Sequence, residues 1–502
     1  MPDAHASTLP DHRVCEKARL SRDARFDGLF FTAVTSTRIY CRPVCPAPSP
    51  KPDNVRYYAS AAAAAAAGFR PCLRCRPELA PGNALWKRGE HAVARALKLI
   101  DSGVLMEHSM DELAARVGVG ARQLRRLFVT HLGAPPIDVH TTRRLLFAKQ
   151  LLTETALPVT EVALASGFGS LRRFNAAFAL ANRMPPRELR RQPPRATDGD
   201  ALVLRLGYRP PYDFDALLAF LRTRALPGVE RVDEHAYLRV FGTAAAPAWL
   251  RLGAWPAGTK PADGHALKLE LHGALPAQML PVVSRLRRMF DLDADPRAIA
   301  ATLGGAGVLK PLLRKRPGLR LPGGWDGFEI AVRAVLGQQV SVAAARTLAT
   351  RIVQRFGEPL AVPVVPGLER LFPTPAQLAD ADLREIGVTT ARAATIRGIA
   401  QALLDGRIDF RAEQPLDEFV ARWVALPGIG AWTAHYIAMR ALSHPDAFPA
   451  ADLILRRAAA GGGAELSTKA LTALAEAWQP WRAYAVMHLW RSTSDAAADT
   501  TT

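Results

Sequence analysis

The stretch Leu426-Pro-Gly-Ile-Gly-Ala-Trp-Thr-Ala-His-Tyr436 lies between two segments of helical pattern. It predicts a tight turn, because proline cannot continue the first helix and glycine accepts backbone angles that other residues avoid. The first amides of the second helix have no partner within that helix, so they can bind a phosphate of DNA. Gly428 and Gly430 are therefore candidate DNA-binding residues, and the stretch predicts two helices joined by a hairpin.

This hairpin resembles the helix-hairpin-helix motif of the DNA glycosylase superfamily. The resemblance implies that Asp452, twenty residues after Trp432, is the catalytic acid. Breaking an N-glycosidic bond builds positive charge on the sugar, and a nearby carboxylate stabilises that charge and orients or deprotonates the attacking water. Members that also cut the DNA strand have a lysine at the position of Trp432, so a hydrolase that leaves an abasic site is expected. A monovalent cation at the hairpin is a further expectation.

Aromatic residues of this half are candidates for a pocket that holds a flipped base. Alkylation of a purine ring nitrogen makes the base cationic, and electron-rich ring faces bind such a cation. The candidate pocket residues are Trp432, Tyr436, Trp490 and Phe220. The alternative, that these rings belong to a hydrophobic core, is the commoner case for aromatic residues in general.

Several segments resemble the AlkA family of alkylbase glycosylases, and this favours the pocket. They are Pro210-Pro-Tyr-Asp-Phe214, Leu319-Arg-Leu-Pro-Gly323, Phe328-Glu-Ile-Ala-Val-Arg-Ala-Val-Leu-Gly-Gln338 and Pro480-Trp-Arg-Ala-Tyr-Ala485. The resemblance runs from about residue 201 to 492. It implies that Gln339 is the wedge that fills the gap left by the flipped base, a position where an apolar residue would be the natural filler. It also implies an N-terminal α+β domain, which fits the alternating apolar and polar runs at 201–206 and 266–272.

Four of the five cysteines lie in two short motifs, Cys41-x-x-x-Cys45 and, after 26 intervening residues, Cys72-x-x-Cys75. This spacing predicts a tetrahedral zinc site with four thiolate ligands, whose usual role is structural. A thiolate bound to zinc is still a nucleophile. Its methylation would remove one negative charge and strengthen binding to DNA. Neighbouring arginines predict an electropositive setting near a phosphate backbone, and they are Arg38, Arg42, Arg70, Arg74 and Arg76.

These motifs resemble the N-terminal domain of the Ada family of bacterial alkylation-response regulators. The matching stretches are Ile39-Tyr-Cys-Arg-Pro-Val-Cys45, Asn54-Val-Arg-Tyr-Tyr58 and Gly68-Phe-Arg-Pro-Cys-Leu-Arg-Cys-Arg-Pro77. The resemblance implies that Cys41 irreversibly accepts a methyl group from DNA methylphosphotriesters, while Cys45, Cys72 and Cys75 complete the zinc ligands. Spacing alone does not select Cys41. Cys15 is expected to be an ordinary free thiol, and no cysteine has the Pro-Cys-His-Arg context that O6-methylguanine repair requires.

A helix-turn-helix pattern occurs twice, because Glu112, Ala114, Gly118 and Gly120 recur 49 residues later as Glu161, Ala163, Gly167 and Gly169. Ser109 and Glu112 predict a capping box at the first helix, and Ser170 is a predicted cap in the second unit. Basic and amide side chains of each second helix face outward, where they suit a DNA major groove. They are Arg122, Gln123, Arg125 and Arg126 in the first unit, and Arg172, Arg173 and Asn175 in the second. One such unit alone is equally compatible with an ordinary helical bundle, but the pair resembles the DNA-binding domain of AraC-type regulators.

The sequence therefore predicts a multidomain, mainly α-helical protein. The expected domains are a small α+β zinc-binding methyl-acceptor domain at 1–80, a double helix-turn-helix domain at 85–192, an α+β (TBP-like) domain like the N-terminal domain of AlkA at 201–290, and an all-α helix-hairpin-helix glycosylase domain at 291–495. A polar, proline-containing linker is expected at 190–200.

The expected function is a bifunctional alkylation response, in which Cys41 accepts the methyl group and switches on sequence-specific DNA binding and transcription, and Asp452 supports release of alkylated purines such as 3-methyladenine. The chief alternative is a transcription regulator with a structural zinc and a C-terminal half that binds DNA without catalysis. A second alternative keeps the glycosylase but leaves the zinc as scaffold.

The net charge of +19 over 502 residues fits a protein that binds a polyanion, although charge alone does not decide this. The expected partners are double-stranded DNA, both alkylated and promoter DNA, and RNA polymerase, and the protein is expected to be a monomer. Neither a secretory signal nor a membrane-spanning run is recognisable, so a cytoplasmic, nucleoid-associated location without membrane contact is expected.

Overall fold

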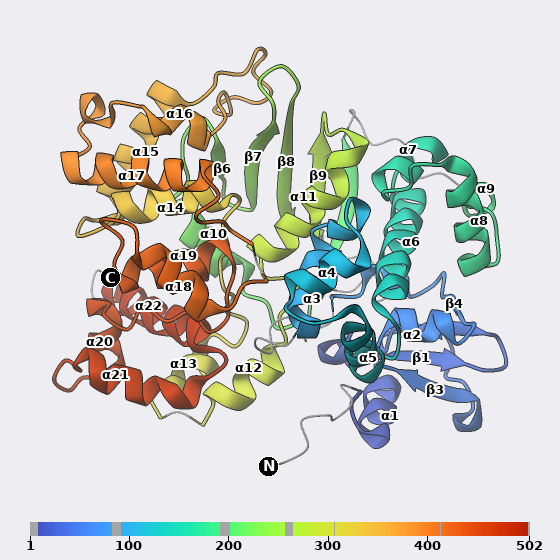
Figure 1. The fold of residues 1–502 in the computed structure, drawn as a ribbon. Helices are drawn as coiled ribbons and strands as arrows, with labels where there is room; N and C mark the ends of the chain where they lie inside the picture. Colours follow the sequence, from blue (N-terminus) through green and yellow to red (C-terminus); the bar gives the residue numbers. More distant parts are fainter. Residues whose placement is uncertain are drawn as a thin grey trace. The chain divides into compact units, whose positions relative to one another are not determined.

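The computed structural model describes residues 9–82, 92–190, 201–256, 265–305, 307–411 and 413–499. The expected linker at 190–200 lies outside these ranges except for its first residue. The chain divides into two compact units (Figure 1). Unit 1 comprises residues 1–210, 252–287 and 292–294, and unit 2 comprises residues 211–251, 288–291 and 295–502.

Unit 1 begins with helix α1 (His12–Leu20) and a four-stranded sheet of order β3-β1-β2-β4. Its strands are β1 (Phe31–Val34), β2 (Ile39–Cys41), β3 (Val55–Tyr58) and β4 (Arg70–Pro71). The β2–β4 pair is parallel, and the other pairs are antiparallel. Helix α2 (Ala61–Ala66) packs on this sheet through Ala64. Ser60 caps α2 by accepting the N–H of Ala63 at 3.0 Å, and Gly68 follows the helix in a left-handed conformation at φ +84°.

The next part of unit 1 is helical. It contains α3 (Ala92–Asp101), α4 (Met110–Arg116), α5 (Ala121–Leu132), α6 (Pro136–Glu154), α7 (Val159–Ala165), α8 (Leu171–Asn182) and α9 (Pro186–Leu189). The predicted capping box at Ser109 and Glu112 is present at the start of α4. Gly118 and Gly167 occupy left-handed backbone conformations between the paired helices, as a tight turn requires. Both predicted helix–turn–helix units are therefore formed, as α4–α5 and α7–α8.

A five-stranded sheet has the order β5-β9-β8-β7-β6, and the division between the units falls within β8. Its strands are β5 (Leu202–Gly207), β6 (Glu230–Val232), β7 (Ala236–Gly242), β8 (Pro247–Ala254) and β9 (Ala266–His272). The β5–β9 pair is antiparallel, with Leu204 opposite Leu269. Both side chains are buried, so the alternating runs of the sequence correctly predicted these two strands.

The accompanying helices are α10 (Phe214–Arg222) and α11 (Pro276–Met289). The rest of unit 2 is helical, with short 3-10 turns. Its helices are α12 (Pro296–Leu303), α13 (Leu309–Lys315), α14 (Gly327–Leu336), α15 (Val342–Phe356), α16 (Pro375–Ala379), α17 (Thr390–Leu404), α18 (Leu416–Val424), α19 (Ala431–Ala441), α20 (Leu453–Ala459), α21 (Thr468–Ala475) and α22 (Arg482–Asp499). Nearly all of α14 is buried, and it packs against α15, α17 and α19. This core fixes the hairpin between α18 and α19, where the predicted DNA-binding glycines lie. The mainly helical, multidomain fold that the sequence predicted is confirmed.

Candidate active sites

The four clustered cysteines come together at one edge of the four-stranded sheet. Cys41 ends β2 and Cys72 directly follows β4, and the parallel pairing of these strands brings both residues to the same edge. Cys45 and Cys75 lie in the loops that follow. All four sulfur atoms lie within 4.8 Å of one another. Thiolates bound tetrahedrally to zinc at about 2.3 Å lie about 3.8 Å apart, so this donor set fits a zinc ion.

Backbone amides support the cluster. The N–H of Arg42 donates to Sγ of Cys75 at 3.3 Å, and the N–H of Arg74 donates to Sγ of Cys72 at 3.4 Å. Such bonds stabilise negative sulfur. Cys72 and Cys75 are buried, whereas Cys41 and Cys45 are half-buried.

The sequence predicted an electropositive setting around the cysteines, but carboxylates neutralise two of the five arginines, Arg42 and Arg76. The Arg42 side chain is 3% exposed and forms an ion pair with Asp27. The Arg76 side chain is 16% exposed and pairs with Glu78 at 3.2 Å and with Glu154 at 2.9 Å. Both guanidinium groups are buried because carboxylates compensate their charge. Arg38 and Arg74 are exposed and Arg70 is half-buried.

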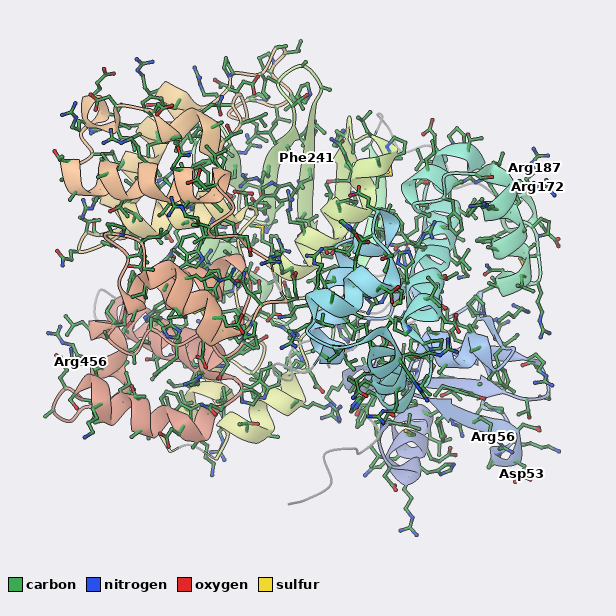
Figure 2. All side chains as sticks on the ribbon, viewed as in Figure 1. Asp53, Arg56, Arg172, Arg187, Phe241 and Arg456 are labelled. Atoms are coloured by element: carbon green, nitrogen blue, oxygen red, sulfur yellow. The ribbon has the colours of Figure 1, made fainter. Side chains whose placement is uncertain are left out.

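The helix-turn-helix candidates lie on the exposed faces of α5 and α8. Arg122, Arg125 and Arg126 are exposed on α5 and Gln123 is half-buried, while the buried Leu124 and Phe128 face inward. On α8 the exposed residues are Arg172, Arg173 and Asn175, opposite the buried Phe174 and Phe178. Figure 2 shows the Arg172 side chain directed away from α8. Each recognition helix thus presents a polar, basic face.

Asp452 is the N-cap of α20, and hydrogen bonds reach both of its carboxylate oxygens. Oδ1 accepts the N–H of Leu455 at 3.0 Å and the indole N–H of Trp490 at 3.2 Å. Oδ2 accepts the indole N–H of Trp432 at 3.0 Å. The two tryptophans come from α22 and α19, so three helices fix the orientation of one carboxylate. Among the described residues Oδ2 accepts a single bond, which leaves it one lone pair for a substrate or water.

The predicted aromatic residues form one cluster around this carboxylate. The rings of Trp432 and Tyr436 stack with centroids 5.4 Å apart, and those of Tyr436 and Trp490 lie 6.3 Å apart. Phe220 joins through Arg440, whose guanidinium lies 4.7 Å from the Phe220 centroid and donates to the Tyr436 hydroxyl at 3.0 Å. Thus the structure brings Trp432, Tyr436, Trp490, Phe220 and Asp452 together.

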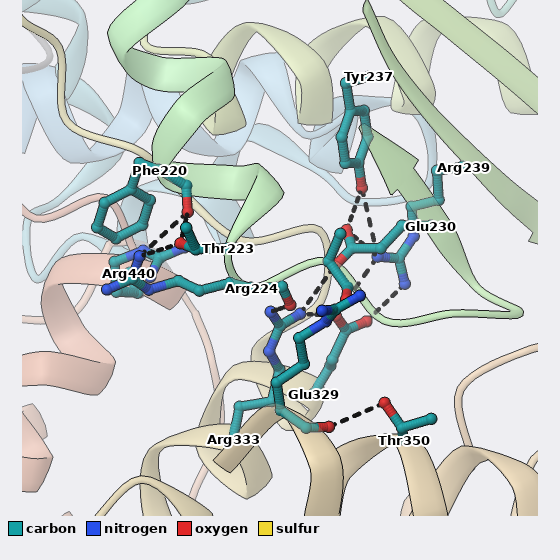
Figure 3. A network of polar contacts seen from close by, with 12 residues as sticks. Phe220, Thr223, Arg224, Glu230, Tyr237, Arg239, Glu329, Arg333, Thr350 and Arg440 are labelled. Carbon is teal, nitrogen blue, oxygen red and sulfur yellow. Dashed lines mark hydrogen bonds and ion pairs between the residues drawn. The ribbon is translucent and has the colours of Figure 1, made fainter. Parts of the chain in front are cut away.

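A second guanidinium, that of Arg224, lies 3.7 Å from the Phe220 centroid, so two cations already contact this ring (Figure 3). Burial lowers the pKa of Arg224 to about 10 and also lowers that of Arg440. Although burial opposes it, the charge of Arg440 and Arg224 lowers the pKa of Tyr436. Two guanidinium groups therefore occupy the Phe220 and Tyr436 side of the cluster, while the Asp452 carboxylate lies on the side of the two tryptophans.

A buried ion network supports the segment that carries Phe220 and Arg224 (Figure 3). Arg333 on α14 donates to Glu230 at 3.0 Å and to Glu329 at 2.8 Å, and it also donates to the carbonyl of Arg224. Arg239 on β7 completes the network through Glu329 at 2.5 Å. These groups are satisfied mutually, as buried charges must be. The network therefore ties β6, β7 and α14 to the end of α10.

The hairpin glycines have different surroundings. Gly428 lies at φ +85°, and a Cβ there would stand 2.0 Å from Oγ1 of Thr395, so only glycine fits. A Cβ on Gly430 would meet nothing within 4 Å, which leaves the start of α19 open to an approaching phosphate.

Gln339 is exposed at φ +54° in the turn between α14 and α15. Its neighbour Gln338 donates to the carbonyl of Gly428 at 3.0 Å, so the turn that carries the predicted wedge is hydrogen-bonded to the hairpin.

Models of known protein families match four segments of the chain. The metal binding domain of Ada matches residues 14–78, and a helix-turn-helix domain matches residues 113–192. The AlkA N-terminal domain matches residues 203–326, and the HhH-GPD superfamily of base excision DNA repair proteins matches residues 332–482. The cysteine cluster falls within the first match, and Asp452 falls within the last.

Whole proteins are similar as well. A protein of Mycobacterium tuberculosis named "Probable bifunctional transcriptional activator/DNA repair enzyme AlkA" is 40% identical over 485 residues, which are 96% of this chain and 96% of that protein. The chain belongs to the family of bifunctional transcriptional activator/DNA repair enzymes. DNA-3-methyladenine glycosylase 2 of Escherichia coli is 35% identical over 57% of this chain and 95% of its own length. The bifunctional activator Ada of Escherichia coli is 40% identical over 23% of this chain and 32% of its own length.

For this member of the bifunctional family, three residues of the glycosylase-like site were not predicted from the sequence. The only feature of the sequence that points to Gln338 is its position beside the predicted wedge Gln339. Arg440 lies four residues after Tyr436 on the same face of α19, and Arg224 lies four residues after Phe220, just beyond the end of α10. A search for cations at that spacing would have found both arginines.

Proposed function

We propose that this chain performs two reactions on alkylated DNA. Cys41 takes a methyl group from a DNA methylphosphotriester, and the C-terminal half hydrolyses the N-glycosidic bond of alkylated purines such as 3-methyladenine. The single observation that carries the second reaction is the carboxylate of Asp452, fixed by two indole N–H groups inside an aromatic cluster. The first reaction is supported by four thiols arranged for zinc, of which Cys41 is one.

In the methyl transfer, Sγ of Cys41 attacks the methyl carbon of the phosphotriester. The S–C bond forms as the C–O bond breaks, and the bonding electron pair stays on oxygen, so the DNA regains a phosphodiester anion. Cys41, Cys45, Cys72 and Cys75 would hold zinc, and zinc keeps such thiols ionised. Four thiolates and one divalent cation carry a charge of about −2, which becomes about −1 once Cys41 is a thioether. The methylated domain therefore repels phosphate less, and we propose that this change switches on promoter binding by α5 and α8.

In the base release, the flipped purine leaves as its bond to the sugar lengthens. Positive charge develops on the sugar, and the Asp452 carboxylate stabilises it. Oδ2 retains an acceptor position with which it orients the attacking water and accepts its proton, and the hydroxyl that remains binds the sugar and completes an abasic site. The chain has Trp432 where a Schiff-base lysine would be needed, so strand cleavage is not part of the proposal.

The proposal extends to the surroundings of the two sites. The domain limits 1–80, 85–192, 201–290 and 291–495 belong to it, as does a monovalent cation at the turn before α19. Alkylated and promoter duplexes are the DNA partners, and RNA polymerase is the protein partner that an activator contacts. We propose a monomer, because each cluster is assembled from one chain, and a cytoplasmic site of action at the nucleoid, where the DNA lies. No helix in the described part of the chain is long and apolar enough to cross a membrane.

Two measurements on the purified full-length chain test the proposal. The first is release of free 3-methyladenine from alkylated duplex DNA, with Asp452→Asn as the inactive variant. The second is mass spectrometry of the peptide containing Cys41 after incubation with DNA methylphosphotriesters. A gain of one methyl group on Cys41 and base release that depends on Asp452 are expected. A protein that binds such DNA but releases no base would instead be a regulator with a noncatalytic C-terminal half.

A further inference from the structure

Arg209, which follows strand β5 of the α+β domain, is completely buried within unit 1. Its guanidinium donates to main-chain carbonyls of three separate segments. Nε donates to Asp27 at 2.7 Å, Nη1 donates to Asp293 at 2.7 Å, and Nη2 donates to Pro81 at 3.4 Å and also to Gly82. Two of these segments, at Asp27 and at Pro81–Gly82, adjoin the cysteine cluster in the sequence. Arg209 therefore joins the α+β domain to the zinc-binding domain.

The Asp27 segment continues this connection to the metal ligands. While the Asp27 carbonyl accepts from Arg209, the Asp27 carboxylate accepts the Arg42 Nε–H at 3.0 Å and forms the buried ion pair with Arg42. Arg42 directly follows Cys41. Its Nη1 donates to the carbonyl of Cys75 at 3.0 Å, and its backbone N–H donates to Sγ of Cys75. Hydrogen bonds thus connect Arg209 through Asp27 and Arg42 to Cys75, and Arg42 is also the chain neighbour of Cys41.

The main chain is closely packed along this path, and two glycines show how closely. A Cβ on Gly28 would lie 2.0 Å from the carbonyl oxygen of Pro81 and 3.1 Å from Nη2 of Arg209. A Cβ on Gly207, in β5, would lie 2.1 Å from the carbonyl oxygen of Leu79. Main chain of the zinc-binding domain therefore contacts main chain of β5 directly, and a shift on one side must be accommodated by the other.

A second set of contacts reaches the same strand from the other side of Cys75. Arg76 donates to Glu154 of α6 at 2.9 Å, and Glu154 accepts the backbone N–H of Arg205 at 3.1 Å. Glu78, whose side chain is completely buried, accepts from Lys149 of α6 at 2.7 Å. Arg42 contacts Cys75, and Arg76 follows Cys75 in the chain. Both arginines are thus bound to residues that in turn contact β5 or the segment just after it.

We propose that Arg209 is a positioning residue for the methyl-acceptor site: acting through Asp27 and Arg42, it holds the loops of Cys41 and Cys75 in the geometry that binds zinc. The effect of Arg209 on zinc binding does not depend on the proposed methyl transfer, and only the description of the site as a methyl acceptor rests on it. In a chain that fuses two repair activities, the α+β domain of the glycosylase half completes the support of the acceptor site. Loss of this support is expected to loosen the metal ligands before it affects Asp452.

The test compares zinc-loaded full-length protein with Arg209→Met, Arg209→Lys and Asp27→Asn. The matched control is Arg25→Met, which removes an exposed arginine that pairs with Asp23 in the same domain. The first readout is the rate of zinc release to a chromogenic chelator. Arg209→Met is expected to release zinc at least tenfold faster than the wild type, Arg209→Lys is expected to restore part of the difference, and Arg25→Met is expected to stay within twofold. Asp27→Asn keeps the carbonyl that Arg209 binds but weakens the Arg42 pair, so it should also release zinc faster.

The second readout is hydrogen exchange measured by mass spectrometry. Faster exchange in residues 41–45 and 72–75 of Arg209→Met supports the proposal. Faster exchange confined to residues 81–82 and 293–294, with unchanged zinc release, overturns it, because Arg209 would then only stabilise the α+β domain. If Arg209→Met does not fold, wild-type zinc release by Asp27→Asn overturns the proposal equally. Neither readout requires methyl transfer or base release, so failure of those activities in the wild type would contradict the proposed function and leave this inference standing.

Discussion

Trp432 and Asp452, twenty residues apart in the sequence, are joined by a hydrogen bond of 3.0 Å between the indole Nε1 and Oδ2. The same indole stacks on Tyr436. Trp432 therefore has two separable properties in the candidate glycosylase site, an aromatic face and an N–H donor. A substitution that removes only the donor distinguishes a role in carboxylate orientation from a role in binding the base.

Trp432→Phe keeps an aromatic ring and removes the N–H group. A hydrogen bond to a charged acceptor contributes about 1.5 kcal/mol, so kcat for base release is expected to fall roughly tenfold with little change in KM. Trp478→Phe is the matched control, because that buried indole has no hydrogen-bond partner among the described residues. Single-turnover kinetics on a duplex with one 3-methyladenine measures the effect. An unchanged kcat together with a raised KM would assign Trp432 to base binding alone.

Asp452→Asn is expected to reduce base release at least 100-fold, because the amide cannot stabilise a positively charged sugar. Asparagine is as good an N-cap as aspartate, so α20 and the fold should be retained. Asp405→Asn, at an exposed position on the same unit, is the control. DNA affinity should remain within a few-fold for both variants. Comparable activity of Asp452→Asn and the wild type would exclude Asp452 as the catalytic acid.

His435 connects the aromatic helix α19 to the loop before Asp452, since its Nδ1 accepts the N–H of Phe448 at 3.3 Å. Burial lowers the pKa of His435 to about 4 from its ordinary 6.5. Between these values the unfolded chain binds a proton that the folded chain excludes. The contribution of His435 to the free energy of unfolding is therefore fully present above pH 6.5 and is lost as the pH falls toward 4. The loss is up to about 1.4 kcal/mol per pH unit.

His435→Gln retains an acceptor but does not titrate, so its unfolding free energy should depend less steeply on pH between 6.5 and 4. Urea denaturation across this range measures the difference. His488→Gln is the comparison, because burial also lowers the pKa of His488 to about 4 while His488 lies on α22. An identical pH dependence in His435→Gln and the wild type would contradict the neutral, buried state of His435.

Gln339→Ala removes the predicted wedge from its exposed turn. Without a side chain to fill the gap in the duplex, base flipping becomes less favourable, and excision from duplex DNA should fall about tenfold, or ~1.4 kcal/mol. Excision from single-stranded DNA should change little, because its bases are already unstacked. The ratio of the two rates is the measurement, and Gln354→Ala on the exposed side of α15 is the control. Equal losses on both substrates would contradict the wedge role.

Arg172→Ala on α8 is expected to lower the affinity for DNA and to make that affinity less dependent on salt concentration. If Arg172 contacts a phosphate, the slope of log K against log salt concentration decreases by about 0.9. Fluorescence anisotropy with an undamaged duplex at several salt concentrations measures this slope, and Arg25→Ala provides the control. A slope and affinity equal to those of the wild type would remove Arg172 from the DNA-binding face.

Local features of this fold were predictable because their determinants lie within a few residues. The capping box of Ser109 and Glu112, the cap at Ser60 and the two turns at Gly118 and Gly167 follow from short-range backbone chemistry. The cysteine cluster was predictable for the same reason, since each half is a short motif. The roles assigned to Cys41 and Asp452 came from resemblance, and they remain predictions.

Long-range electrostatic contacts were not predictable from the sequence. Arg42 was expected to add positive charge around the cysteines, but it is buried and Asp27 compensates its charge. The contact between Arg440 and Phe220 was missed because Arg440 reaches that ring from a helix more than 200 residues later. A sequence pattern shows which side chains are charged, but only packing shows which partner neutralises each one.

The bare backbone at Gly28 and Gly207 has a consequence for protein engineering and for gene fusion. Neither position tolerates even a methyl group, because a carbonyl of the facing segment occupies that space. An acceptor module transplanted from a free-standing regulator would therefore dock here only if it carried glycine at the equivalent of position 28. The two modules are therefore structurally adapted to each other. Recombination between distant homologues should succeed only when both glycines are inherited together.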